Sequence, residues 1–481
     1  MVKSPDESIG TEGHKGVEGI RHRRLEHWSY SSMFLGISSI SMLVISRLIY
    51  FYQVAVGLAI WMITIGYAVY SIWDAINDPL IGHLSDRNNR YTRKWGKRYP
   101  WMLFTTVPLV VTMVLIFTPP DIALANGLFT FFWFIFILII FDSLYSAFTV
   151  NYTAQLPNKY RRIDERTSIS SITIIFQTIG TLIGFILPLL FFITPLATNP
   201  AEYFPVAVFA SCLFLLVVGL ARPGLREDQN MIESYYIETK EQEPFTTSFM
   251  ANLRVGFGQR SFVLILVVVI AINLANLLTI PMVPYFVNFV VEGVNRTFYE
   301  MLLWILYMLG GVVMIPVGYA SCRRFGNFHV WKVSLILTGC SYLLLFAAGG
   351  DAIFSLVSIF ILGALIAIAN ISYFVTRADF YDEVAVIHEK RQEGIYSGLL
   401  VVFSRFARII SLFLIAIIQT LTFFDPAASI QLPMAQFGIL FTLTVIPGIT
   451  FILAGIILWR YWTLTPDRVV EVKAKLRGIG I

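Results

Sequence analysis

Two carboxylates stand four residues apart inside an otherwise apolar stretch of the chain, at Asp74 and Asp78. Positions i, i+3 and i+4 share one face of a helix, so Asp74, Asn77 and Asp78 are expected to present their oxygens together. Acids are costly within a membrane and normally line a cavity or an ion path. Because hard cations favour oxygen ligands and carboxylates also bind protons, the spacing predicts a site for Na⁺ or H⁺. The alternative is that the acids pair with an arginine and only hold helices together.

The composition is that of a membrane protein. Of the 481 residues, 57% are hydrophobic and 14% are charged, whereas soluble domains carry about 25% charged residues. Residues 1 to 27 are polar and lack the apolar core of a signal peptide, so the first apolar run is expected to stay in the mature protein. The three cysteines have no metal-ligand spacing, and the chain shows no P-loop, HExxH motif or nucleophile triad. We therefore expect no enzyme, no cofactor other than a coupling ion and no nucleic-acid partner.

Apolar runs of membrane-spanning length recur twelve times along the chain. They are expected at about 29–52, 57–84, 100–118, 124–152, 168–194, 204–221, 261–291, 299–320, 328–348, 353–376, 394–423 and 436–463. The long polar connection 222–260 divides them into two halves of six, which is typical of a transporter with its binding site between the halves. We expect an all-α polytopic membrane protein with a tail at 1–28, a bundle at 29–221, a central loop at 222–260, a second bundle at 261–463 and a tail at 464–481.

Lysine and arginine gather in the even-numbered connections, above all in 85–99, 156–167 and 222–260. Basic loops stay on the cytoplasmic side of a membrane, so both termini are expected in the cytoplasm. We expect a multi-pass protein of the cell membrane that is a monomer in the lipid bilayer. Its other partners are expected to be a small solute and a monovalent cation.

The second span and the loop after it resemble the glycoside–pentoside–hexuronide:cation symporter family of the major facilitator superfamily, which the melibiose permease typifies. The resemblance rests on Ile72-Trp-Asp-Ala-Ile-Asn-Asp-Pro79, Gly82 and Arg93-Lys-Trp-Gly-Lys-Arg-Tyr-Pro-Trp101. A second similar region contains Ala378-Asp-Phe-Tyr-Asp382, Glu393, Ile395-Tyr-Ser397 and Arg405. The resemblance implies a major facilitator fold of twelve helices and import of a small solute, most directly a sugar or glycoside, driven by Na⁺ or H⁺.

The resemblance also implies roles for single residues. The family's cation site would consist here of Asp74, Asn77, Asp78 and Ser146, with Asp74 and Asp78 as the sodium ligands if the ion is sodium. Arg405 stands where the family more usually has a lysine, and Arg408 follows three residues later. Because arginine does not lose its proton, Arg405 would act as a fixed counter-charge.

The sugar-binding side departs from the family. Ser38, Thr149, Thr153 and Ile174 stand where the family has two aspartates, a tryptophan and an arginine that grip the sugar. A pocket without those groups leaves a second solute class open, because the related sodium-coupled lysophospholipid symporters have a more apolar cavity. A non-transporting receptor or scaffold is a third hypothesis, against which the costly acid pair counts.

Other polar residues lie within the predicted spans. Arg47 and Asp142 are expected either to pair with each other across the first half or to contact the solute. Pro281 and Pro284 interrupt the seventh span and would free carbonyl groups beside a cavity. The remaining candidates for the solute site are Ser38, Asp142, Tyr145, Thr149, Thr153, Asn273, Asn276, Asn370 and Tyr373, for which polar helix packing is the alternative.

Charges at the predicted cytoplasmic ends suggest a gate. Asp86, Arg87 and Arg98 are expected to tie the second and third spans to the underside of the first half. Glu393 lies on the corresponding side of the second half. Ion pairs between these loops would close the inner face in one state only, as alternating access requires; the alternative is solvated charge that serves topology.

Overall fold

The computed structural model is described here for all residues except 1–21, 87–91, 122–125, 161, 195, 230, 233–256, 389–392, 463, 465 and 480–481. Within these residues the fold is entirely helical and contains no strand. The first half consists of α1 (Arg24–Tyr50, continued by η1, Phe51–Ala55), α2 (Ile60–Asp86), α3 (Thr92–Trp95), α4 (Tyr99–Ile116), α6 (Gly127–Lys159), α7 (Ile163–Ile186, continued by η2, Leu187–Leu190), η3 (Pro200–Glu202) and α8 (Tyr203–Leu225).

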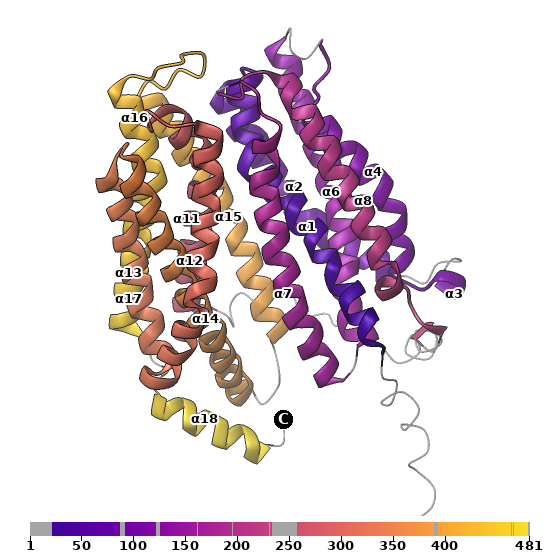
Figure 1. Ribbon diagram of the computed structural model, residues 1–481. Coiled ribbons are helices and arrows are strands. Elements are labelled where there is room, and N and C mark those ends of the chain that lie inside the picture. The colour runs from indigo at the N-terminus through magenta and orange to yellow at the C-terminus, as the bar shows by residue number, and fades with distance from the viewer. Residues whose placement is uncertain are drawn as a thin grey trace, which may run out of the picture.

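The second half consists of α11 (Arg260–Phe289), α12 (Arg296–Phe325), α13 (Asn327–Ala348), α14 (Ala352–His388), α15 (Glu393–Leu421), α16 (Pro433–Leu440), η4 (Phe441–Val445) and α17 (Ile446–Tyr461), followed by α18 (Pro466–Ile479). Figure 1 shows the two groups of helices side by side, indigo to magenta and red to yellow. The beginning of α1 and the whole of α18 lie at the same, lower end. The all-α prediction is therefore confirmed, although the predicted tail at 464–481 contains a further helix.

Eleven helices of the described chain are long and apolar enough to cross a membrane. Among the long helices, α2 does not meet that criterion, although it has 27 residues and lies where the second span was predicted. Its polar residues lower its hydropathy, and they include Asp74, Asn77 and Asp78. The acid pair thus lies on the long helix that is less apolar than the others.

Small residues allow neighbouring helices to approach closely. A Cβ atom on Gly363 of α14 would lie 2.0 Å from the Tyr307 carbonyl oxygen of α12, and one on Gly310 would lie 2.2 Å from the Phe360 carbonyl oxygen. In the first half, a Cβ on Gly180 of α7 would lie 2.4 Å from the Leu35 carbonyl oxygen of α1. Glycine is needed at these crossings because helix association in lipid depends on close packing. The contacts make each half a rigid support for the residues between them.

Candidate solute and cation site

A cavity of about 330 Å³ lies between the two halves, lined by α1, α2 and α6 from the first half and by α11 and α15 from the second. Its polar lining is Ser41, Tyr67, Tyr70, Asp74, Asp78, Asp142, Tyr145, Ser146, Thr149, Ser404, Arg405, Arg408 and Ser411. Its apolar lining includes Val44, Ile45, Ile49, Leu138 and Phe141. Helices from both halves therefore face one chamber that contains acids, guanidinium groups and hydroxyls.

The acid pair of α2 meets two arginines of α15 across the chamber. Arg405 donates from Nη2 to the Asp78 carboxylate and from Nη1 to the Asp74 carbonyl oxygen at 2.7 Å. The Arg405 Nε lies 3.3 Å and the Arg408 Nη1 3.2 Å from Asp74 Oδ2. Arg405 and Arg408 are three residues apart, so both project from one face of α15. The arginine pairing that the sequence left open as an alternative is what the structure shows for both acids, and it joins the two halves.

Asp142 of α6 is placed differently from the acids of α2. Its side chain is buried, and its Oδ2 accepts a hydrogen bond from Asn77 Nδ2 at 3.3 Å. Among the described residues, no lysine, arginine or histidine lies within ion-pair distance of Asp142. The expected pairing of Arg47 with Asp142 is wrong, because Arg47 donates instead to Glu300 Oε1 of α12 at 2.5 Å. The end of α1 faces the second half, which turns Arg47 away from α6.

The structure brings only part of the predicted solute site together. Tyr145, Ser146 and Thr149 line the cavity beside Asp142, at the one-turn spacings expected of one helix face. Ser38, Thr153, Asn273, Asn276, Asn370 and Tyr373 are not among the lining residues that the structure describes.

Some of these other candidates bond to neighbours on their own helix. Thr153 Oγ1 donates to the Thr149 carbonyl and Asn273 Nδ2 to the Val269 carbonyl, while the Tyr373 hydroxyl accepts from Arg377.

Two aromatic residues of the cavity are absent from the residues predicted for the site. Tyr67 and Tyr70 line it from α2, and the Arg408 guanidinium carbon lies 5.2 Å from the centre of the Tyr70 ring. A cation over an aromatic face is attracted by the ring electrons. The signal was present in the sequence, because Tyr67, Tyr70, Asp74 and Asp78 follow one another at helical spacings of three and four.

The contacts expected at the lower end are present within the first half. Arg98 donates to Asp86 Oδ1 at 2.5 Å and to Ser85 Oγ at 2.8 Å, which ties the start of α4 to the end of α2. Arg87 lies outside the described residues, and so does the side chain of Glu393. A charge pair between the loops of the two halves therefore stays a prediction.

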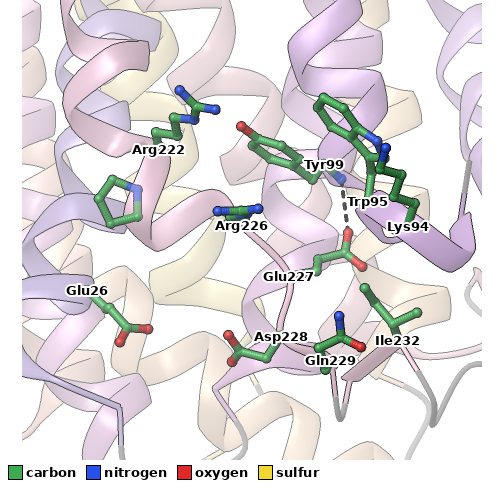
Figure 2. Close-up of a pocket in the computed structure, with 11 residues that line it drawn as sticks. Glu26, Lys94, Trp95, Tyr99, Arg222, Arg226, Glu227, Asp228, Gln229 and Ile232 are labelled. Atoms are coloured by element: carbon green, nitrogen blue, oxygen red, sulfur yellow. Dashed lines mark hydrogen bonds between the residues drawn. The ribbon is translucent and has the colours of Figure 1, made fainter.

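A surface pocket of about 490 Å³ lies beside this contact, lined from the beginning of α1, from α3 and α4, and from the end of α8 onward. Figure 2 shows Glu227 pointing at the backbone of Tyr99 and the basic side chains of Lys94, Arg222 and Arg226 around it. The Glu227 carboxylate accepts from the backbone nitrogens of Lys97 and Tyr99, both at 2.9 Å. A carboxylate there satisfies free N–H groups at the start of a helix. Glu227 thus fastens the connection after α8 to α4.

The opposite end of the chamber is closed by contacts between the halves, which we term the far-end closure. It consists of Arg47 with Glu300 (2.5 Å), Gln53 with Gln419 (2.7 Å) and Tyr285 (2.5 Å), Tyr50 with Asn288 (2.8 Å), and the stacked rings of Phe185 and Trp304 (3.7 Å between centres). These residues lie where α1, α7, α11 and α15 end and α12 begins. Access from that end is blocked in this conformation.

Two helical halves around a chamber closed at one end define a multi-pass membrane transporter. Residues 29–463 match the family model described as "MFS/sugar transport protein", and the chain belongs to this family. The predicted family and the major facilitator fold are thereby confirmed. Solved structures of similar fold include a D-xylose-proton symporter, with a TM-score of 0.61, 14% identity and coverage of 91% of this chain and 97% of that one. Another is the nucleoside transporter NupG, with a TM-score of 0.59 and 13% identity over 90% of this chain and 99% of the other.

Curated relatives differ in the solute that their names state, and some names state none. The "Isoprimeverose transporter" of Lactiplantibacillus pentosus is 28% identical over 48% of this chain and 46% of its own, so the match spans less than half of that relative. The "Inner membrane symporter YicJ" of Escherichia coli K12 is 24% identical over 89% of both chains. The "Sodium-dependent lysophosphatidylcholine symporter 1" of Mus musculus is 23% identical over 85% of this chain and 79% of its own.

Proposed function

We propose that this protein is a secondary active symporter that imports a small solute, a sugar or glycoside, together with a monovalent cation. The observation that carries the proposal is the chamber between the halves, which combines titratable acids with hydroxyl groups and is closed at one end. Opening and closing the two ends in turn would move the solute across the membrane, because solute and ion bind the two states differently. No cofactor takes part other than the coupling ion.

The lining of the chamber supports a solute rich in hydroxyl groups. Tyr145, Ser146 and Thr149 on α6 face Ser404 and Ser411 on α15, so donors and acceptors converge from both halves. Sugar hydroxyls need such partners, because a buried polar group without one costs about 1–3 kcal/mol. The rings of Tyr67 and Tyr70 supply flat surfaces against which a sugar ring can pack. The name of the isoprimeverose transporter points to the same solute class.

A second candidate is an amphipathic solute such as a lysophospholipid. The wall formed by Val44, Ile45, Ile49, Leu138 and Phe141 would accept an acyl chain. The arginines of α15 would meet a phosphate group. The lysophosphatidylcholine symporter of Mus musculus is similar over most of the chain, which supports this candidate as well.

Placement in the membrane follows from charge. We propose that the protein functions as a monomer in the cell membrane, with the lower end of Figure 1 in the cytoplasm. Basic residues such as Lys94, Arg222 and Arg226 surround the pocket at that end, as the positive-inside rule requires. The far-end closure would then seal the outer side, and the chamber would exchange with the cytoplasm.

Reconstituted protein tests the proposal directly. Proteoliposomes are loaded with buffer and offered isoprimeverose, xylose or lysophosphatidylcholine, with and without a proton or sodium gradient. We expect a gradient to accelerate uptake of a sugar. Stimulated uptake of lysophosphatidylcholine alone would establish the second candidate. Symport of these solutes is refuted if no gradient stimulates uptake of any of the three and if none of the three solutes shifts the melting temperature of the purified protein. That result would support the scaffold hypothesis.

A further inference from the structure

The charges of the chamber do not balance. Its described lining contains three carboxylates, those of Asp74, Asp78 and Asp142, and two guanidinium groups, those of Arg405 and Arg408. Arginine keeps its charge in proteins, so the full set carries one excess negative charge when every acid is ionised. A buried charge without a partner is costly, and one bound monovalent cation removes the excess. The question is which carboxylate receives it.

Ion pairs already occupy the two acids of α2. Arg405 contacts both Asp74 and Asp78, and Arg408 contacts Asp74. A sodium ion needs several oxygen ligands at once, and at this place it would also lie against two guanidinium groups. The arginines therefore fill the position in which the family resemblance puts the cation.

Asp142 has the opposite surroundings. It is buried at 4% exposure, lines the chamber and receives a hydrogen bond from the Asn77 amide. Charged groups that act on it are the carboxylates of Asp74 and Asp78 from α2 and the more distant Arg408 from α15. Uncharged groups of the same chamber near it are Ser41 of α1, Tyr70 of α2 and Tyr145 of α6.

We propose that Asp142 is the carboxylate that takes up and releases the coupling ion, and that this ion is a proton. The inference rests on the proposed symport and assigns its ion site. A proton forms an O–H bond on one Asp142 oxygen and cancels the excess charge without further ligands. The Asn77 amide can then rotate so that its oxygen accepts from this O–H, because an amide offers both a donor and an acceptor. Deprotonation restores the arrangement that the structure shows.

The position on α6 links the proton to the solute. Tyr145, Ser146 and Thr149 lie three, four and seven residues after Asp142 and line the same chamber. A solute held by these residues displaces water from the vicinity of Asp142. Loss of water disfavours the ionised carboxylate, so solute and proton strengthen each other's binding.

Infrared difference spectroscopy on the purified full-length protein tests the assignment without any solute. A pH titration in potassium chloride should reveal the carbonyl band of a protonated carboxylic acid in the wild type. We expect Asp142→Asn to abolish this band, while Asp74→Asn and Asp78→Asn retain it. Asp142→Glu should restore a band at a shifted frequency, which controls for misfolding of the amide variant. The band persisting in Asp142→Asn, or vanishing only in Asp78→Asn, would overturn the proposal.

Two further comparisons separate this inference from the proposed function. Replacing potassium with sodium at constant pH should leave the band unchanged; its removal by sodium would make sodium the coupling ion and refute the proton assignment. In proteoliposomes, a pH gradient should stimulate isoprimeverose uptake at least tenfold less in Asp142→Asn than in the wild type. If the wild type transports neither sugar nor lysophospholipid, the proposed function fails, whereas the infrared result still decides where the proton binds.

Discussion

At the scale of single residues, Arg405 and Arg408 determine the chemistry of the chamber. Each projects from α15 towards the acid pair of α2, so charges that are costly alone are neutralised at the boundary between the halves. Arg405 reaches both acids because a guanidinium group offers several donors in one plane, which an ammonium group does not. This residue thereby sets the electrostatics of the site and part of the adhesion between the halves.

Removing Arg405 should convert the acid pair into a cation site. Arg405→Ala leaves Asp78 without its guanidinium partner, so we expect a loss of stability of about 1–3 kcal/mol, below that of a fully buried pair because Asp78 is partly exposed. Sodium should then raise the melting temperature of the variant, and we expect no such effect on the wild type. Arg460→Ala, at an exposed position of α17, is the control. If sodium does not raise the melting temperature of Arg405→Ala, Arg405 does not take the place of a bound cation.

At the scale of helices, the two ends of α1 make contacts of different kinds. The end of α1 carries Arg47 and Tyr50 into the far-end closure, where Arg47 is 1% exposed and meets Glu300 of α12. The segment before α1 carries His22, which lies 3.3 Å from Glu165 of α7 and 3.2 Å from Asp228 after α8. One helix thus bridges the two halves at one end and fastens its own half at the other.

Weakening the far-end closure should open the chamber from that side. Glu300→Gln leaves the Arg47 charge buried without a counter-charge, which costs on the order of 3 kcal/mol in the closed state. A cysteine in place of Ile49, which is buried on the cavity wall, should then react at least tenfold faster with an impermeant thiol reagent added from that side. Glu292→Gln, an exposed acid-to-amide change at the same end, should leave the rate unchanged. Equal rates in the two variants would show that the ion pair does not hold the closure.

The contact of His22 predicts a pH dependence. The hydrogen bond that His22 donates to the Asp228 carboxylate raises the pKa of His22 above its ordinary 6.5, with Glu165 adding to the effect and burial and Lys159 opposing it. The stabilisation is therefore complete below pH 6.5 and is lost as the pH rises through the raised pKa. The same contact lowers the pKa of Asp228 below 3.8, which matters only in stronger acid.

We accordingly expect the melting temperature of the wild type to fall as the pH rises above 6.5 through the raised pKa of His22. His22→Ala should flatten this dependence, with a difference of less than about 1 kcal/mol because Asp228 is half exposed. His329→Ala, outside this cluster, is the control. A slope that is identical in His22→Ala and in the wild type would remove His22 as its source.

At the scale of the molecule, the two halves enclose one chamber whose openings must face opposite sides of the membrane. The beginning of α1 and the helix α18 lie at one end of the molecule, so we expect both to lie on one side of the membrane. Lys473 of α18 lies 2.7 Å from Asp379 of α14, which holds this last helix against the second half. The orientation of the protein in the membrane is therefore known once the side on which α18 lies is known.

Thiol labelling of intact cells measures the orientation. In a background without Cys212, Cys322 and Cys340, a cysteine at Asn199 should react with an impermeant reagent from outside. A cysteine at Glu471 on α18 should react only after the membrane is permeabilised. Labelling of Glu471→Cys in intact cells would reverse the proposed topology.

The sequence by itself determined where the long apolar helices lie and several of the residues that line the chamber. Long apolar runs form spanning helices because lipid offers the backbone no other hydrogen-bond partners. The acid pair, Asn77 and Arg405 were recognisable because polar residues stand out in such runs. Tyr67 and Tyr70 share the helical spacing of the acids, so they too were within reach of sequence reasoning.

Only the tertiary structure decided which polar residues meet. Arg47 pairs with Glu300 rather than with Asp142, and Asn273 bonds to its own helix rather than lining the chamber. A spanning helix is apolar towards lipid and towards its neighbours alike, so hydropathy does not reveal which face turns to which partner. That choice depends on close packing at positions such as Gly180 and Gly310, where small side chains let one particular helix approach. Asp142 likewise meets Asn77 only because α6 packs against α2.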